Sequence, residues 1–312
     1  MFASCMNLGN LRFSALKDIA KNLVPATASR TLPRSMWTLP SSRPAQEAVI
    51  TFDDVKDAER ASSCILPTTW VDCPLVGSSQ YNHDTYIFEF GLPDGKSLDL
   101  PTCACLLVRA FDKEGKEAVR PYTPISNNAM LGKFQLMIKV YEQGVVSQYC
   151  KNMKIGDVLS FKHITFNCKI RYPFGKKSIT MCGGGSGITP MYQALQCLID
   201  TPGDETDITL LLGNKSKADI LLKDELDGMV ARSNGRLKIV HVLSDANSLP
   251  NDWTGETGFI DKAKIEKYAY PAAPDTCVFV CGVPQMYEML CGPRTEKEVK
   301  EGSILAQLGA SL

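Results

Sequence analysis

The feature that most constrains this chain is a strand, a glycine loop and a helix that follow one another directly over residues 178–195. The apolar run at 179–182 is typical of a buried strand. The four glycines among residues 183–187 allow backbone angles and close approaches that side chains forbid. Thr189 stands where an N-cap would stand, and Pro190 suits the first position of a helix. Such a helix directs free N–H groups at an anion, so we expect a phosphate-bearing ligand above the loop.

The spacing of the loop leaves the kind of ligand open. The usual dinucleotide fingerprint has a third glycine or alanine where this chain has Pro190. The loop is not a P-loop either, because no Lys-Ser or Lys-Thr pair follows the glycines. A tight turn that binds nothing is the alternative reading of this stretch.

Length and composition limit the possible functions. A chain of 312 residues is longer than one core usually serves, so two domains are expected. Lysine plus arginine and aspartate plus glutamate both number 34, and this zero net charge argues against a nucleic-acid binder. No apolar run approaches the roughly 20 residues of a membrane span. The 12 cysteines include no C-x-x-C pair and only three histidines are present, so we expect reduced thiols and no metal site.

Residues 1–45 differ from the rest of the chain. Six basic residues face a single acid, Asp18, among many serines, threonines and alanines. This basic, amphipathic and acid-poor composition is typical of an organelle transit peptide, with the mitochondrion favoured over the plastid. A disordered or interaction tail is the alternative, and a cytoplasmic location also stays open. Residues 46–63 are interpreted as a linker.

Residues 64–172 are rich in short β-type runs separated by turn residues, which predicts an antiparallel barrel or sandwich. One helix is expected within this domain, over residues 145–153, entered through Gly144. That entry is a second candidate seat for a phosphate. The expected strands lie at 86–90, 105–110, 134–141 and 158–161, and a further strand ends in the segment that begins at Arg120.

Residues 173–312 alternate between strand and helix, which predicts a parallel sheet with helices on both faces. Ligands of such sheets bind beyond the carboxyl ends of the strands. The glycine loop and the segment 281–286 both follow strands and are therefore expected to face one site. The expected strands are 179–182, 208–212, 237–243 and 277–280, and the expected helices are 190–199, 219–231, 261–268 and one that begins near Pro284.

Three motifs in order resemble those of one family. They are Arg-Pro-Tyr-Thr-Pro-Ile-Ser at 120–126, Gly-Gly-Ser-Gly-Ile-Thr-Pro at 184–190, and Cys-Gly-Val-Pro-Gln-Met at 281–286. The first offers a cation, an aromatic face and a hydroxyl within four residues. Together they resemble the NADH–cytochrome b5 reductases of the ferredoxin–NADP reductase superfamily, over residue 65 to the C-terminus. The resemblance implies a barrel that binds FAD and an α/β domain that binds the nicotinamide dinucleotide.

The resemblance also implies roles for individual residues. Arg120 would pair with the FAD pyrophosphate, Tyr122 would line the flavin, and Thr123 would lie near its reactive nitrogen. Thr189 would touch the flavin from the second domain, and Thr123, Lys139 and Cys281 would border the place of hydride transfer. His83 resembles a family residue near the flavin, although a packed surface histidine is as good a reading. The implied cofactor-binding residues are Arg120, Pro121, Tyr122, Thr123, Met137, Lys139, Val145, Val146, Ser147, Gly184, Gly185, Ser186, Gly187, Thr189, Asp245, Gly282, Pro284 and Met286.

The implied reaction takes hydride from NADH to FAD and passes single electrons to a haem protein, and it needs no acid–base residue. Asp245 resembles the family's acidic residue that disfavours NADPH, whereas Lys215 and Lys217 would favour it. Val283 replaces a usual proline, Ser186 a usual threonine, and the insertion before Gly144 is nearly absent. The chain ends before the last strand that the resemblance implies, so we expect the sheet edge to lack that strand.

The acceptor is expected to be a small acidic haem protein such as cytochrome b5. Between residues 151 and 177 a local basic excess faces one acid, Asp157; a solvated surface is the alternative reading. Other functions also stay open: a diaphorase-type reductase with a different acceptor, a methyltransferase whose cofactor binds at the glycine loop, or a non-catalytic docking subunit. The basic residues are Lys151, Lys154, Lys162, Lys169, Arg171, Lys176 and Lys177.

Overall fold

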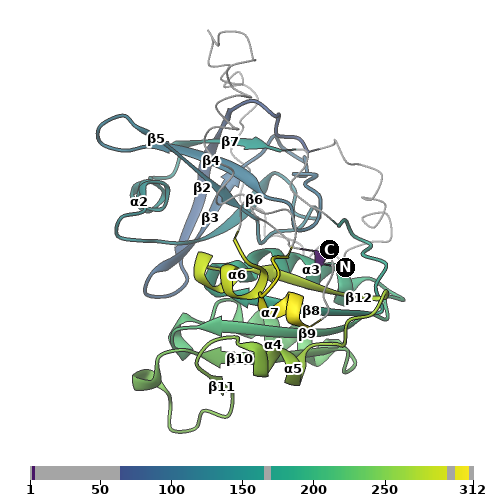
Figure 1. Cartoon of the computed structure of the whole chain (residues 1–312). Helices are drawn as coiled ribbons and strands as arrows, with labels where there is room; N and C mark the ends of the chain where they lie inside the picture. The colour runs from purple at the N-terminus through teal and green to yellow at the C-terminus, as the bar shows by residue number, and fades with distance from the viewer. Residues whose placement is uncertain (1, 4–63, 165–169, 294–298, 309–312) are drawn as a thin grey trace. The chain divides into compact units, whose positions relative to one another are not determined.

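The computed structural model describes residues 2–3, 64–164, 170–293 and 299–308, in two compact units (Figure 1). One unit is antiparallel and contains residues 64–164. The other is the α/β unit, which contains residues 170–308 together with Phe2 and Ala3. Apart from those two residues, the expected targeting segment and the linker lie outside the described residues. None of the helices in the described ranges has the length and apolar character that crossing a membrane requires.

The antiparallel unit is built from one six-stranded sheet in the order β5-β4-β7-β2-β3-β6. The helix α2 (Val145–Asn152) follows Gly144 as predicted and contacts β4 and β5. The strands are β2 (Val71–Gln80), β3 (Thr85–Gly91), β4 (Leu106–Phe111), β5 (Glu117–Tyr122), β6 (Lys133–Lys139) and β7 (Val158–His163).

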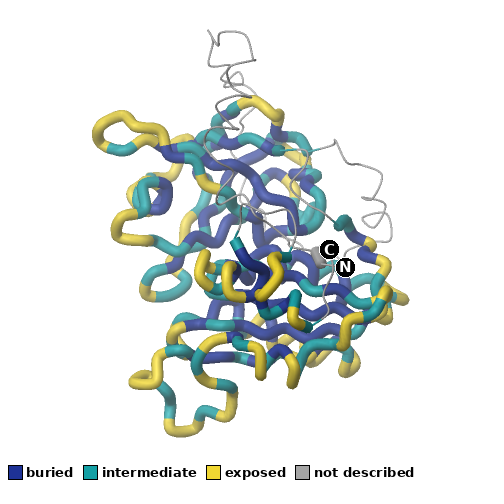
Figure 2. Tube along the Cα trace, viewed as in Figure 1, coloured by how far each residue is buried: buried dark blue, intermediate teal, exposed yellow. Residues whose placement is uncertain are grey.

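Aromatic packing shows that this sheet curls strongly. The ring centroids of Phe134 on β6 and Phe161 on β7 lie 5.2 Å apart, although two strands separate β6 from β7. In a flat sheet that separation would be about 14 Å, at roughly 4.8 Å per strand. Phe90 on β3 packs 4.8 Å from Phe161 and completes the cluster. The three rings are fully buried, and Figure 2 shows buried residues along the strands of this unit. The expected antiparallel barrel architecture is confirmed.

The α/β unit has a parallel sheet in the order β1-β12-β8-β9-β10-β11, as predicted. α5, α6 and α7 pack on one face around Leu211 and Val280, while α3 and α4 contact each other and cover the opposite face (Figure 1). At one edge, β1 pairs with β12. The strands are β1 (Phe2–Ala3), β8 (Ser178–Gly184), β9 (Asp207–Asn214), β10 (Leu237–Leu243), β11 (Glu256–Thr257) and β12 (Thr276–Cys281). The helices are α3 (Ile188–Asp200), α4 (Lys223–Arg232), α5 (Lys262–Tyr268), α6 (Pro284–Cys291) and α7 (Ile304–Gln307).

Two helix starts differ from the sequence prediction. α3 begins at Ile188 with Gly187 at its N-cap, so Thr189 and Pro190 lie inside the first turn rather than at the cap and first position. A 3-10 turn over Gly185–Gly187 leads into α3 and moves its start forward. α4 begins at Lys223 instead of residue 219, because Leu222 adopts a left-handed conformation (φ 57°) that breaks the run.

Candidate functional site

In the α/β unit, the glycine loop and the segment after β12 meet directly. β8 and β12 are neighbours, with Cys281 opposite Gly183 in the register. A side chain on Gly187 would collide with the carbonyl of Cys281 and come within 2.9 Å of the nitrogen of Gly282. Glycine is therefore required at position 187 because two backbones touch there. The two segments therefore lie side by side, and that they face one ligand site stays a prediction.

The side chain of Met286 packs between the glycine loop and the segment after β12. A Cβ on Gly184 would lie 2.8 Å from the sulfur of Met286, and one on Gly282 would lie 2.6 Å from the same sulfur. Met286 belongs to the first turn of α6, whose N-terminal residue is Pro284. The thioether thus fills the space that the two glycines leave open, and it fixes the start of α6 beside the glycine loop.

The start of α3 has the properties of an anion seat. It has no side-chain cap and no acidic residue in its first turn, although the N–H of Ile188 already donates to the carbonyls of Gly185 and Ser186. Gly185 has φ +52° and no atom lies within 4 Å of where its Cβ would be, so the loop is open to a ligand on that side. The hydroxyl of Thr189 donates to the carbonyl of Ser186 at 3.2 Å and holds the loop against the helix.

The next strands place charged groups at the same edge of the sheet. Asp245 follows β10 and is exposed, and its carboxylate accepts from the backbone N–H of Asn247 at 3.0 Å. The backbone N–H of Asp245 donates to the carbonyl of Lys215, at 3.0 Å. Lys215 follows β9 and is also exposed. An acid and a base therefore stand side by side beyond the carboxyl ends of the sheet.

The antiparallel unit has an anion seat of its own at the start of α2. Gly144 caps this helix, which has no side-chain cap and no acid in its first turn. The hydroxyl of Ser147 donates to the Gly144 carbonyl at 3.1 Å and accepts from the N–H of Tyr141 at 3.2 Å, which fixes the turn. A groove of about 540 Å³ runs beside this helix end, and the exposed rings of Phe111 and Tyr149 offer faces to a planar group.

β5 presents the first motif next to α2. Arg120 is exposed, and its guanidinium donates to the carbonyl of Val119 at 2.8 Å. Burial raises the pKa of the Tyr122 phenol, Cys150 of α2 raises it further, and Arg120 acts in the opposite sense. The structure thus brings Arg120 and Tyr122 together with the helix. Thr123 directly follows the strand and is buried.

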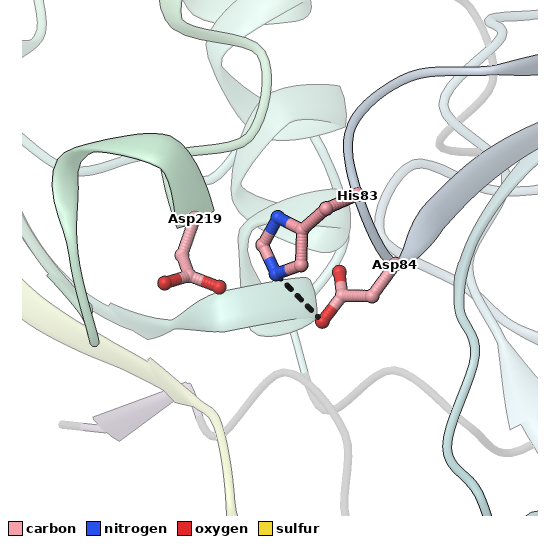
Figure 3. A group of neighbouring side chains, drawn as sticks. All are labelled: His83, Asp84 and Asp219. Atoms are coloured by element: carbon pink, nitrogen blue, oxygen red, sulfur yellow. Dashed lines mark ion pairs between the residues drawn. The ribbon is translucent and has the colours of Figure 1, made fainter.

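Met137 and Lys139 lie two residues apart on β6 and therefore share one face of the sheet. Met137 is buried, whereas Lys139 is one-fifth exposed and its ammonium lies 2.7 Å from the Asp84 carboxylate. The exposed ring of His83 also contacts that carboxylate, with its Nε2 atom 3.4 Å from the oxygen that faces Lys139 (Figure 3). The Thr85 hydroxyl donates to the other carboxylate oxygen at 2.9 Å.

Asp84 was not predicted from the sequence. The only signal was its place between His83 and Thr85, and its partner Lys139 is 55 residues further on. The turn that presents Asp84 is rigid, because the side-chain oxygen of Asn82 accepts from the N–H groups of both Asp84 and Thr85.

The basic residues predicted to attract an acidic partner protein differ in exposure and in their contacts. Lys151 and Lys154 are exposed near the end of α2. Lys162 is half-buried on β7 with its ammonium 4.7 Å from the centre of the Trp70 ring, and burial lowers its pKa. Lys176 donates to the carbonyl of Pro274 at 2.7 Å. Lys169 lies outside the described residues.

The residues present fit dinucleotides in both units. Each unit offers a helix of eight or more residues that has glycine as its N-cap residue and carries neither a side-chain cap nor an acid in its first turn. Arg120 next to α2, and the open side of Gly185 next to α3, suit pyrophosphates. Neither unit needs a nucleophile for this binding. The residue roles assigned in the sequence analysis stay predictions.

Comparison with known proteins identifies both units. Residues 72–168 match the family model of the oxidoreductase FAD-binding domain, and residues 181–292 match that of the oxidoreductase NAD-binding domain. NADH-cytochrome b5 reductase 2 of Scheffersomyces stipitis is 36% identical over 246 residues, which cover 78% of this chain and 81% of that protein. NADH-cytochrome b5 reductase 1 of Dictyostelium discoideum is 42% identical over 213 residues, which cover 68% and 72%.

Among solved structures, the chain is similar to the cytochrome b5 reductase domain of Ulva prolifera nitrate reductase. The TM-score is 0.67 at 29% identity, over 78% of this chain and 95% of that one. These matches confirm the resemblance found in the sequence, the two-domain fold, and the two cofactors FAD and NAD. They leave no reason to retain the methyltransferase alternative.

Proposed function

This chain belongs to the NADH–cytochrome b5 reductase family, and we propose that it takes hydride from NADH and passes single electrons to an acidic haem protein such as cytochrome b5. The observation that carries the proposal is the paired set of glycine-capped, acid-free helix starts, one in the FAD-binding unit and one in the NAD-binding unit. Two anion seats in one chain are what a flavin dinucleotide and a nicotinamide dinucleotide require.

The residues of this chain bind and orient rather than donate protons. When bound, FAD and NADH supply the hydride and electron transfer. Gly144, Ser147 and Arg120 would hold the FAD pyrophosphate, and Tyr122 and Thr123 would lie along the flavin. The contact of Gly187 with Gly282 keeps the NAD-binding loops in one arrangement. Such fixed positioning is the main contribution a protein makes to hydride transfer between two cofactors.

A haem protein as acceptor is supported by the names of the relatives and by the exposed lysines near α2. If Lys151 and Lys154 attract an acidic partner, the encounter depends on Coulomb attraction over a Debye length of about 10 Å at 0.1 M salt. The rate constant for reduction of cytochrome b5 should then fall as salt increases. The rate with ferricyanide, an anion of a different size and charge, should respond differently.

Charge reversal provides the test of this acceptor. The double variant Lys151→Glu, Lys154→Glu should lower kcat/KM for cytochrome b5 and leave the rate of flavin reduction by NADH unchanged. Lys116→Glu, at an exposed lysine next to β5, is the matched control and should change neither. We choose these lysines over Lys162, whose contact with Trp70 makes its reversal a packing change as well. Equal rates with cytochrome b5 in all variants would refute a role of Lys151 and Lys154 in docking, and no haem reduction would refute this acceptor.

A preference for NADH over NADPH follows from Asp245. Its exposed carboxylate would repel a 2′-phosphate bound at the carboxyl end of β10. The neighbouring Lys215 acts in the opposite sense, so the preference is expected to be modest. Steady-state kcat/KM values with both cofactors decide the point, and a higher value with NADPH would refute it.

Mitochondrial targeting by residues 1–45 is proposed from their composition alone. A fusion of residues 1–45 to a fluorescent protein should enter mitochondria in cells. The same fusion with Lys17 and Lys21 changed to glutamate should stay outside. Diffuse fluorescence from the unmodified fusion would refute the proposal.

A further inference from the structure

Asn214, the last residue of β9, has a buried side-chain amide. The residue is only 7% exposed, and neither its amide oxygen nor its amide nitrogen has a hydrogen-bond partner among the described residues. The backbone carbonyl of Asn214, by contrast, is hydrogen-bonded: it accepts from the N–H of Ser244 at 3.0 Å and from the hydroxyl of Ser244 at 3.3 Å. The amide therefore plays no part in joining the ends of β9 and β10.

The position of Asn214 places this amide beside the glycine loop. Gly213, the preceding residue, is the register partner of Gly184, and Asn214 itself is opposite Leu243. Side chains alternate along a strand, so Asn214 shares a face of the sheet with Leu212. A Cβ on Gly183 would lie 3.3 Å from Leu212 and 3.9 Å from the carbonyl of Gly187, so this is the face on which the loop turns into α3.

A buried amide without a hydrogen-bond partner lowers the stability of the protein when no ligand is bound. Two donors and two lone pairs lose their water on burial and gain nothing in return. Leucine has a similar size and would occupy the same place without that cost. Buried polar groups in folded proteins are nearly always paired, and an exception calls for a cause.

We propose that Asn214 is a positioning residue for the bound dinucleotide. The dinucleotide binds at the carboxyl edge of the sheet and orders the glycine loop and the β9–α4 connection. In that bound state the side-chain amide of Asn214 acquires the hydrogen-bond partner that it lacks among the described residues of the free protein. The inference rests on the proposed function, because it takes the NAD-binding unit to bind NAD(H). It adds a residue that none of the three sequence motifs contains.

The test is a pair of opposed measurements on the full-length protein with its FAD. In Asn214→Leu, the thermal midpoint without nucleotide should equal or exceed that of the wild type. The dissociation constant for NAD⁺, measured by calorimetric titration, should rise by about fivefold, which corresponds to one net hydrogen bond. If the Asn214 amide has no role in binding, Asn214→Leu should show the unchanged or higher thermal midpoint without any rise in the dissociation constant for NAD⁺.

Gln196→Leu is the matched control. The side-chain oxygen of Gln196 is also buried without a partner among the described residues, but it lies two turns into α3, away from the loop. Its loss should leave NAD⁺ affinity unchanged. Asn214→Asp keeps the shape of the side chain and adds a negative charge near the phosphates, so it should weaken NAD⁺ binding more than leucine does.

Three results would overturn the inference: NAD⁺ affinity equal to wild type in either Asn214 variant, an equal loss of affinity in Gln196→Leu, or a lower thermal midpoint in Asn214→Leu. The last would mean that the amide has a partner in the free protein. If the wild type itself does not bind NAD⁺, the proposed function fails together with this inference. If the wild type binds and the variants bind equally well, only this inference fails.

Discussion

The ion pair between Asp84 and Lys139 gives the sharpest prediction for the site. Lys139 is the residue of the antiparallel unit that the family resemblance places next to the nicotinamide. Its ammonium is held 2.7 Å from Asp84, and the two side chains are 20% and 24% exposed. Asp84→Asn keeps the shape and the contact with Thr85 but removes the charge, so Lys139 should lose its fixed position.

The size of the effect follows from the burial of the pair. Exposed ion pairs contribute about 0.2–1 kcal/mol, and a pair that is mostly covered and hydrogen-bonded should lie near the upper end, at about 1 kcal/mol. That value corresponds to about a fivefold change in an equilibrium constant. We therefore expect the KM for NADH to rise about fivefold in Asp84→Asn, with ferricyanide as the acceptor so that docking of a haem protein does not contribute.

The chain supplies a matched control at the other end of the same two strands. Lys133 contacts both carboxylate oxygens of Glu89, at 2.9 and 2.8 Å, and these side chains are 31% and 24% exposed. Lys133 and Lys139 are the first and last residues of β6, about 20 Å apart at the rise of an extended strand. Glu89→Gln should lower stability by a similar amount and leave the KM for NADH unchanged. An unchanged KM in Asp84→Asn, or equal rises in both variants, would refute the reasoning.

Three further predictions concern other parts of the two units. Gly187→Ala should destabilise the NAD-binding unit by about 1–3 kcal/mol in chemical denaturation, because its Cβ meets the Cys281 backbone, whereas Ala at the exposed helical Gly228 should stabilise it slightly. Arg120→Ala should lose FAD, seen as a lower flavin-to-protein absorbance ratio after gel filtration; full retention would show that Arg120 does not hold the pyrophosphate. Burial, and then Lys223, lower the pKa of His241, so the unfolded chain binds more protons and the free energy of unfolding should fall as pH drops below about 6.5; His241→Phe should lose this dependence between pH 7.5 and 5.5.

The sequence predicted the NAD-binding unit well because its strands are continuous apolar runs bounded by glycine and polar turns. The strand predicted at 237–243 has the bounds of β10, and the loop at 183–187 joins β8 to α3 as expected. The start of α4 was wrong for a local reason. Ser216 and Asp219 form a capping box, which is a helix signal, but here it closes a single 3-10 turn before Leu222 reverses the backbone.

The antiparallel unit was harder to read. β2 was not among the strands named from the sequence, because Pro74 and Gly77 interrupt its pattern. Proline is tolerated there because β2 changes neighbours at this point: residues 71–74 pair with β7 and residues 75–80 pair with β3. At the site, the three motifs were visible, whereas the Asp84–Lys139 pair and the unpaired amide of Asn214 depend on strand register.

If one chain holds both FAD and a site from which NADH reduces it, the flavin of the purified protein should respond directly to NADH. The most direct measurement is the visible absorption spectrum of the purified protein, recorded without oxygen before and after one equivalent of NADH. We expect flavin bands that bleach on addition of NADH and return when oxidised cytochrome b5 is added. A protein without flavin bands, or with bands that NADH does not bleach, would contradict it.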